Sequence, residues 1–301
     1  MKLVFKHTLI LLLYIFASKV FAQHQNVWSN YQLNASSINP AAIGKDEALE
    51  VNIYSRKQWA GFSGSPLTNI LSINSMIKRP SVNVGLLVSD DRIGSTVNQN
   101  IAATYAYRIK FKKHKLSFGL QAGAQFLNSN INRLIRVEQI DQVVDLNQTK
   151  KVGFTAGAGI FLHNKHYYAG LSIPNLYSVN GLQLNKVPIY LTGGYILKIR
   201  ENKDLLKPSF LIRRIDATAL TFDLNMTYYI NSIFGLGVSY RNKNAIVGLL
   251  ELIVNDQFKL AYSYDYSITS ISNYQTGSHE LSIRYLFGKK LKMNNPRALY
   301  F

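Results

Sequence analysis

Apolar and polar residues alternate with a period of two along most of this chain. In the stretch TALTFDLNMTYYI (218–230), one face carries leucine, phenylalanine, methionine and tyrosine, whereas the other carries threonine, aspartate and asparagine. The stretches 115–126 and 257–266 repeat this pattern. Because successive side chains of a β-strand point to opposite faces, each stretch predicts a strand with one face suited to hydrocarbon and one suited to water.

The alternation predicts about fourteen strands, many of them close to ten residues long. That length matches a strand that crosses a bilayer at a tilt, whereas strands of soluble sheets usually have five or six residues. Tyrosines at the ends of the apolar faces, Tyr105 with Tyr107 and Tyr228 with Tyr229, predict aromatic girdles at the membrane interfaces. The predicted spans are 48–57, 67–77, 81–89, 97–109, 115–127, 152–162, 166–173, 188–199, 207–214, 217–230, 233–241, 244–253, 257–266 and 278–287.

The junctions between these spans alternate in length, although not strictly. KRP, KFKKH, LHNK, NS and NDQ are short, whereas the fifth, seventh and thirteenth junctions are long. RENKDLL is long for a turn, and RNKN is short for a loop. Short periplasmic turns alternating with longer surface loops are typical of bacterial outer-membrane barrels.

The first residues have the features of a secretory signal peptide. Two lysines precede an apolar run from Thr8 to Ala17, and the small residue Ala22 precedes Gln23. We therefore expect cleavage after Ala22. The apolar run is too short for a membrane-spanning helix, which needs about 18 residues.

The composition is that of an exported membrane barrel. Hydrophobic residues make up 47% of the chain, charged residues only 17%, and cysteine is absent, which excludes disulfides and thiolate metal sites. In lipid, only helices and closed barrels satisfy their backbone hydrogen bonds. The sequence therefore predicts an all-β fold, a transmembrane antiparallel up-and-down β-barrel of about fourteen strands in the outer membrane. The expected parts are a signal peptide (1–22), a periplasmic N-terminal segment (23–46), the barrel (47–287) and a periplasmic C-terminal tail (288–301).

The positive charge indicates an acidic partner or anionic lipid. The formal net charge is +18, and an exported chain does not meet nucleic acid, so we expect no nucleic-acid partner. A cluster of one sign accelerates and orients association, so the lysines in the predicted periplasmic turns and tail form a hypothetical docking surface. The alternative is that they keep this rim soluble and attract lipid headgroups. The lysines of this hypothetical surface are Lys110, Lys112, Lys113, Lys115, Lys289, Lys290 and Lys292.

The stretch QWAGFSGSP predicts the first external loop. Its glycines permit turn conformations, its proline stiffens the start of the next strand, and its two aromatic residues either anchor the loop at the membrane interface or fold inward over the lumen. We expect Trp28 and Tyr31, which precede the first strand, to close the periplasmic mouth. The residues that shape the outer mouth in this hypothesis are Trp59, Gly61, Phe62, Gly64 and Pro66.

The candidate chemistry is weak. His163 and His166 lie in a predicted turn without further metal ligands nearby, and SDDRIG predicts a solvated loop in which Asp90 or Asp91 pairs with Arg92. In GSHE (277–280), neighbouring side chains of a strand point to opposite faces, so the serine and the histidine do not converge. We therefore expect no enzyme activity, no metal and no cofactor.

Ten segments stand out when the chain is read in order: YQLNASSINPAAIG, RKQWAGFSGSP, SDDRIGS, YAYRI, LSFGLQAG, YYAGLSIPNL, GVSYRNKNAIVGL, LAYSYDYS, TGSHELSIRYLF and NPRALYF. Together they resemble the PorP/SprF family of outer-membrane proteins of the type IX secretion and gliding systems of Bacteroidetes. The resemblance implies a barrel without catalytic activity that helps cargo proteins cross or attach at the cell surface. It also implies partners among the periplasmic and outer-membrane components of that system, the secreted cargo and outer-membrane lipid.

A second hypothesis of a different class is an outer-membrane channel or transporter for small hydrophobic or polar solutes. A steady conductance from the protein alone in a planar bilayer favours the channel. A gene for a cargo protein with a type IX sorting domain directly upstream favours the secretion component.

Overall fold

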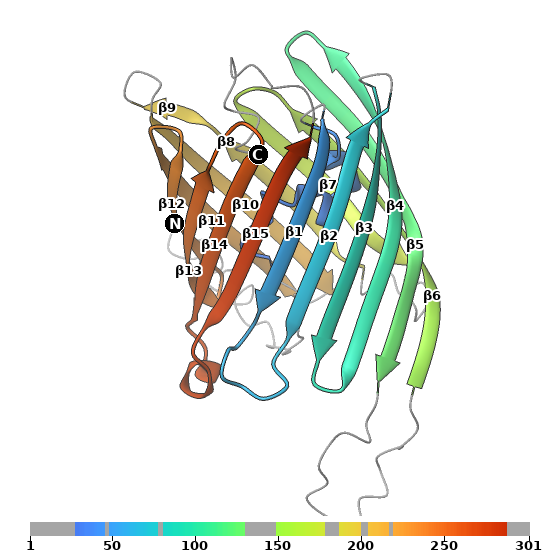
Figure 1. The fold of residues 1–301 in the computed structure, drawn as a ribbon, viewed down its shortest axis with the longest axis vertical. Coiled ribbons are helices and arrows are strands. Elements are labelled where there is room, and N and C mark those ends of the chain that lie inside the picture. The colour runs from blue at the N-terminus through green and yellow to red at the C-terminus, as the bar shows by residue number, and fades with distance from the viewer. Residues whose placement is uncertain are drawn as a thin grey trace, which may run out of the picture.

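A computed structural model describes residues 28–45, 48–77, 81–129, 149–177, 187–199, 204–216 and 219–287. Its strands form one sheet in which each neighbouring pair is antiparallel, and the pairing of β10 with β11 closes the sheet into a barrel. Figure 1 shows the first strand, β1, beside the last, β15. The strands are β1 (Leu49–Lys57), β2 (Leu67–Met76), β3 (Val82–Ile93), β4 (Thr96–Phe111), β5 (His114–Ser129), β6 (Thr149–His163), β7 (Tyr167–Tyr177), β8 (Ile189–Tyr195), β9 (Leu197–Ile199), β10 (Asp204–Asp216), β11 (Ala219–Ile230), β12 (Phe234–Arg241), β13 (Ala245–Ile253), β14 (Phe258–Ser267) and β15 (Ser278–Phe287).

The predicted fold is confirmed, and each predicted span coincides with a strand of the barrel. The span 188–199 forms two pieces, β8 and β9, which occupy one position beside β10, so the barrel has fourteen strand positions. The interruption is Ile196, whose side chain is buried in the interior core and whose N–H donates to the carbonyl of His166.

Several strands are longer than the alternation predicted. Strand β3 continues through Asp90 and Arg92, where the sequence predicted a solvated loop, and a tight turn at Gly94 leads to β4. The predicted ion pair forms, with Arg92 Nε 2.8 Å from Asp90 Oδ2. The strand continues here with polar residues on both faces. A prediction that depends on apolar residues therefore places the end of the strand too early.

The outer surface is apolar and the inner surface polar. On β11, Leu224 and Met226 point outward and are about half exposed, whereas Asp223, Asn225 and Thr227 point inward and are buried. Tyr105 and Tyr107 lie on the outer face, as predicted, but Tyr229 points inward and is fully buried, so it does not belong to a girdle with Tyr228. Within the described residues, no helix is long and apolar enough to cross a membrane.

The two ends of the barrel differ in their connections. One end, called the short-turn end, carries the connections 112–113, 164–166, 231–233 and 254–257. The other, called the long-loop end and lying at the bottom of Figure 1, carries 58–66 and 268–277 together with the shorter connections 94–95 and 242–244. The fifth and seventh predicted junctions fall largely outside the described residues. By the rule for bacterial barrels, the short-turn end faces the periplasm.

Candidate functional site

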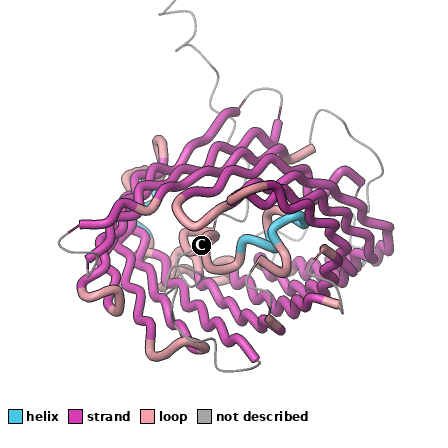
Figure 2. The backbone as a smooth tube through the Cα atoms, turned by 90° about the horizontal axis from the view of Figure 1, so that it is seen from above, coloured by secondary structure: helices cyan, strands magenta, loops and turns pink. Residues whose placement is uncertain are grey.

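The segment Trp28–Lys45 lies inside the barrel. Nearly all of its residues are buried, and Figure 2 shows its 3-10 turns, η1 (Ala35–Ser37) and η2 (Pro40–Ala42), within the ring of strands. The sequence placed this part of the chain in the periplasm, with Trp28 and Tyr31 at the periplasmic mouth. Instead, Trp28 packs edge-on against Tyr54 of β1 and Tyr31 accepts a hydrogen bond from Asn225 of β11, both in the interior. We call residues 28–45 the lumenal segment.

Hydrogen bonds from side chains to main-chain carbonyl groups join the lumenal segment to the wall of the barrel. The Ser172 hydroxyl donates to the carbonyl of Ile38 at 2.6 Å, and an Arg108 Nη2 group donates to the carbonyl of Ile43 at 3.1 Å. In the reverse direction, the Asn39 amide donates to the carbonyl of Ile160 at 3.0 Å. A segment without helix or strand partners along most of its length needs such acceptors and donors, because buried backbone groups are costly when unpaired.

Two glycines bring this segment against the wall. Gly119 of β5 and Gly159 of β6 lie opposite each other in the sheet and point inward. A Cβ atom on Gly119 would overlap the backbone of Pro40 and Ala41, and one on Gly159 would overlap the Asn39 side chain. The NPAA turn therefore fits only because these two wall positions lack side chains.

A row of alternating charges crosses the interior in the half nearer the long-loop end. The closest contacts are those of Arg56, whose guanidinium lies 2.7 Å from both Asp265 and Glu280. All six side chains are almost completely buried, and three positive groups balance three negative ones. In order of contact, the row is Arg213, Asp223, Arg241, Asp265, Arg56 and Glu280, with successive N–O distances of 2.9, 3.3, 2.7, 2.7 and 2.7 Å.

This charged row clamps the start of the lumenal segment. The Ser29 N–H donates to Glu280 Oε2 at 2.9 Å, and the Asn30 N–H donates to the other oxygen of the same carboxylate. The Ser29 hydroxyl donates to Asp265 at 2.8 Å and accepts from Arg241 at 2.8 Å. Hydrogen bonds to charged groups contribute about 1.5–3 kcal/mol each, so this clamp fixes the segment strongly.

A second charged cluster lies nearer the short-turn end. The Glu251 carboxylate is 2.5 Å from the Lys259 ammonium and 3.8 Å from the Lys207 ammonium, and it accepts a hydrogen bond from the Tyr229 hydroxyl at 2.6 Å. Both ammonium groups also lie over the Tyr229 ring, at 5.2 and 5.5 Å from its centre. Removing the carboxylate would leave two buried cations close to each other.

The sequence did not predict that the residues of either charged cluster lie together. The period-two pattern did place Asp223, Lys259 and Asp265 on inward faces. Nothing in the pattern shows which charges meet, because the partners come from different strands. The signal available was a charge at an inward position of a strand whose other face is apolar.

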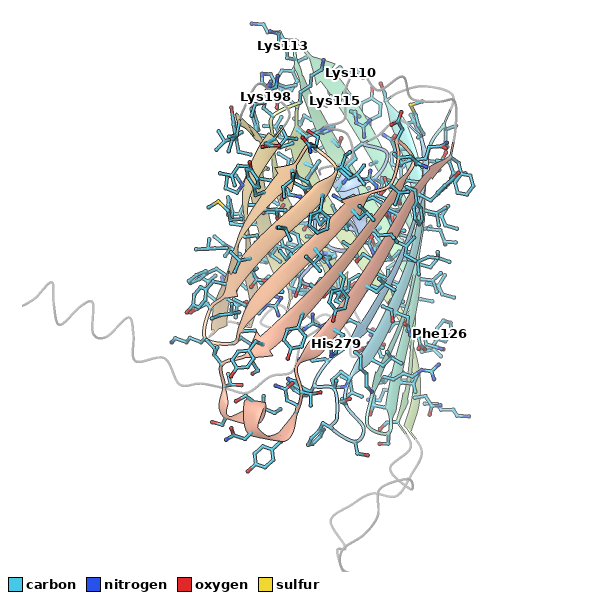
Figure 3. The ribbon with its side chains drawn as sticks, turned by 60° about the vertical axis from the view of Figure 1, so that its left-hand side comes forward. Lys110, Lys113, Lys115, Phe126, Lys198 and His279 are labelled. Carbon is cyan, nitrogen blue, oxygen red and sulfur yellow. The ribbon has the colours of Figure 1, made fainter. Side chains whose placement is uncertain are left out.

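The structure brings four of the seven predicted docking lysines together. Lys110 and Lys115 lie opposite each other at the end of the β4–β5 hairpin, and Lys112 and Lys113 form its turn. Figure 3 shows Lys110, Lys113 and Lys115 at the same end of the barrel as Lys198. Lys289, Lys290 and Lys292 lie outside the described residues.

The predicted outer-mouth loop is tied to loops on both sides. The Ala60 N–H donates to the carbonyl of Gly277, and the Gly94 N–H donates to the carbonyl of Gly64. Trp59, Gly61 and Gly64 have φ values of 52°, 86° and 70°. Pro66 is buried, whereas Phe62 is 49% exposed and therefore does not fill the lumen.

The other candidates for chemistry do not converge. Ser278 and Glu280 point inward, whereas His279 points outward with its Nδ1 2.7 Å from the Tyr262 hydroxyl. His163 ends β6, and His166 lies in the following turn. Within the described part of the chain, no three histidine, aspartate or glutamate side chains are grouped to hold a metal ion.

Comparison with known proteins identifies one family model. It describes the type IX secretion system membrane protein PorP/SprF and matches residues 20–285. No curated protein matches the chain. Among solved structures, the outer membrane protein Omp33 of Acinetobacter baumannii is similar at 10% identity with a TM-score of 0.46, covering 80% of this chain and 98% of that one. The CymD monoaromatic hydrocarbon channel is similar at 10% identity and a TM-score of 0.48, covering 86% and 94%.

Proposed function

The chain belongs to the PorP/SprF family of type IX secretion system membrane proteins, and we propose that it acts as a plugged outer-membrane platform that binds partner proteins. In this role the barrel supports secretion of cargo proteins, or their attachment at the cell surface, and it does not conduct solutes. The observation that carries the proposal is the lumenal segment, which occupies the interior and is clamped at Ser29 and Asn30.

The occupied lumen supports a binding role over a channel role. A solute channel needs a continuous water-filled path. Here most inward side chains are buried, and several of them contact residues 28–45. One cavity beside residues 28–45, between Tyr31, Phe161 and Tyr168, measures about 10 Å³, which is room for roughly one water molecule. The surfaces left to act are the two ends of the barrel and its outer wall.

The short-turn end supplies the surface for a periplasmic partner. Lys110, Lys112 and Lys113 are exposed at the tip of the β4–β5 hairpin, and no acidic residue lies in that tip. Exposed charge pairs are individually weak and are screened by salt, but a cluster of one sign steers association. An acidic surface on another component of the secretion system fits this cluster.

A charge reversal tests the docking surface. We would replace Lys112, Lys113 and Lys115 by Glu and measure co-purification of secretion-system components at low and moderate salt. The matched control reverses three exposed lysines at the long-loop end, Lys150, Lys151 and Lys243. We expect the first variant alone to lose its partners, with unchanged heat-modifiability on gels. Equal, salt-insensitive co-purification of both variants would leave only a lipid-binding role for the hairpin.

Conductance separates the platform from the channel. The purified wild-type barrel should give no steady conductance in a planar bilayer, because its own chain fills the lumen. A steady current or solute flux from the protein alone would support the solute-transport alternative and contradict the proposal.

A further inference from the structure

In the described strands, positive charge on the outer wall occurs at one end only. Within the described strands, the alternation places four lysines or arginines on the outward face. Each lies within three residues of the strand terminus at the long-loop end. The other lysines and arginines of these strands have inward positions. The four outward residues are Lys57, Arg92, Lys150 and Arg214.

Two of these cations belong to one row across the sheet. The register places His279 of β15 opposite Lys57 of β1, Lys57 opposite Leu67 of β2, and Leu67 opposite Arg92 of β3. Neighbouring strands are about 4.8 Å apart, so Lys57 and Arg92 lie roughly 10 Å from each other on the same face. His279, labelled in Figure 3, lies far from the lysines of the short-turn end. We call Lys57, Arg92 and His279 the outer-wall patch.

The height of the patch corresponds to the headgroup region of a bilayer. Ile53 and Ile101 are about half exposed and belong to the apolar surface that contacts lipid. Lys57 follows Ile53 by four residues, which is about 13 Å along the strand and roughly 10 Å along the membrane normal for a strand tilted by about 40°. Between them, Ser55 donates to Asn69, and Gln99 donates to Asp90, so the surface becomes polar before it becomes cationic.

The patch keeps donors available for a ligand. The Arg92 side chain is 59% exposed, and its Nε donates a hydrogen bond to Asp90. This contact leaves both of its Nη groups available to a ligand. The Lys57 ammonium has three N–H groups, of which one donates to the carbonyl of Ser65 at 3.2 Å. Arginine and lysine with spare donors at a membrane interface are typical ligands of phosphate headgroups.

We propose that Lys57, Arg92 and His279 bind the phosphate groups of the glycolipid in the outer leaflet of the outer membrane. Charge complementarity and position support this ligand. The outward face at the short-turn end instead carries aromatic and aliphatic residues such as Tyr107, Ile109 and Phe111. Such an asymmetry fits a membrane whose outer leaflet alone is rich in phosphorylated glycolipid.

The test measures binding of fluorescent diphosphoryl lipid A to the purified barrel in neutral detergent. We expect K57Q/R92Q to raise the Kd about tenfold or more, and added salt to weaken the wild type more than this variant. The matched control, K165Q/K198Q, removes two exposed charges at the opposite end and should bind like the wild type. Heat-modifiability on gels verifies that each variant is folded.

Three outcomes would overturn the proposal. The first is an unchanged Kd for the folded K57Q/R92Q variant. The second is equally tight binding of lipid A from which both phosphates have been removed. The third is displacement of lipid A by millimolar inorganic phosphate, which would indicate a site for free phosphate instead of a lipid.

Discussion

The outer wall and the lumen of this barrel follow the same alternation of residues but depend on different contacts. Outward residues such as Leu224 and Leu250 meet a uniform apolar solvent, so one apolar side chain can replace another at little cost. Inward residues such as Glu251 and Asn225 meet specific partners from other strands and from the lumenal segment. The wall of this barrel therefore tolerates substitution of one apolar residue by another, whereas the interior does not tolerate loss of its specific partners.

The largest difference between the two regions should appear at neighbouring residues of β13. Replacing Glu251 by Ala removes the carboxylate that lies beside the buried ammonium groups of Lys207 and Lys259, so we expect a loss of about 3–5 kcal/mol in the free energy of unfolding. Leu250, the next residue, points to lipid, and Leu250→Val should cost about 1 kcal/mol or less, because it removes one methylene group from contact with lipid. Urea unfolding in lipid vesicles measures both. Similar losses would show that the interior does not need its ion pairs.

Lysine substitutions at two neighbouring positions of β11 compare the lipid face with the lumenal face. Leu224→Lys places a charge near the middle of the lipid face and should cost about 2–4 kcal/mol. Asn225→Lys would be nearly neutral in a water-filled lumen. In this structure the Asn225 amide donates to the Tyr31 hydroxyl, so the longer side chain must displace the lumenal segment and we expect a cost of about 1–3 kcal/mol. A neutral Asn225→Lys would mean that water fills this part of the barrel.

Two glycines allow a smaller version of the same test. Gly119→Ala inserts a methyl group into the backbone of Pro40 and Ala41, so it should destabilise the barrel by about 1–3 kcal/mol. Gly248 of β13 faces outward with nothing near its Cβ position, and Gly248→Ala should have little effect. Thiol labelling of a Ser36→Cys reporter follows the lumenal segment, because displacement makes that thiol accessible. Equal labelling rates in both alanine variants would place the segment away from Gly119.

The smallest effect on stability is expected at the outer-mouth loop. Phe62 is exposed, and replacing Trp59 and Phe62 by Ala should change the free energy of unfolding by less than about 1 kcal/mol. If the loop takes part in cargo handling, the variant should still display less cargo at the cell surface, as measured by antibody binding to intact cells. Normal display would assign the two aromatic residues to membrane anchoring.

The difference between wall and lumen also explains what the sequence could predict. Lipid imposes the same requirement on every outward position, so Leu220, Leu224 and Met226 could be assigned from periodicity alone. The lumenal segment has no such regular pattern. Its clamp joins Ser29 to Glu280, 251 positions apart, and no local rule connects them.

Some segments of the site could be singled out in the sequence, although their structural roles could not be predicted. The stretch NPAAIG was among those that resemble the family, and its Pro40–Ala42 turn proves to be the part that rests on the glycines of β5 and β6. The lysines of the β4–β5 hairpin could be grouped because a tight turn keeps them adjacent. The charged row could not be assembled, since it requires the order of the strands around the barrel.

The most direct test of the plugged lumen is a cross-link between the lumenal segment and the wall. The chain contains no cysteine, so a Ser36→Cys/Asn74→Cys variant carries only the two introduced thiols. In the structure the Asn74 amide nitrogen lies 3.4 Å from the Ser36 hydroxyl. Treating intact cells with a thiol cross-linker that is small and apolar enough to reach buried thiols should therefore join the N-terminal segment to β2, seen as one linked peptide pair by mass spectrometry. Two unlinked thiols that both react with a water-soluble reagent in the folded barrel would contradict a lumen filled by its own N-terminal segment.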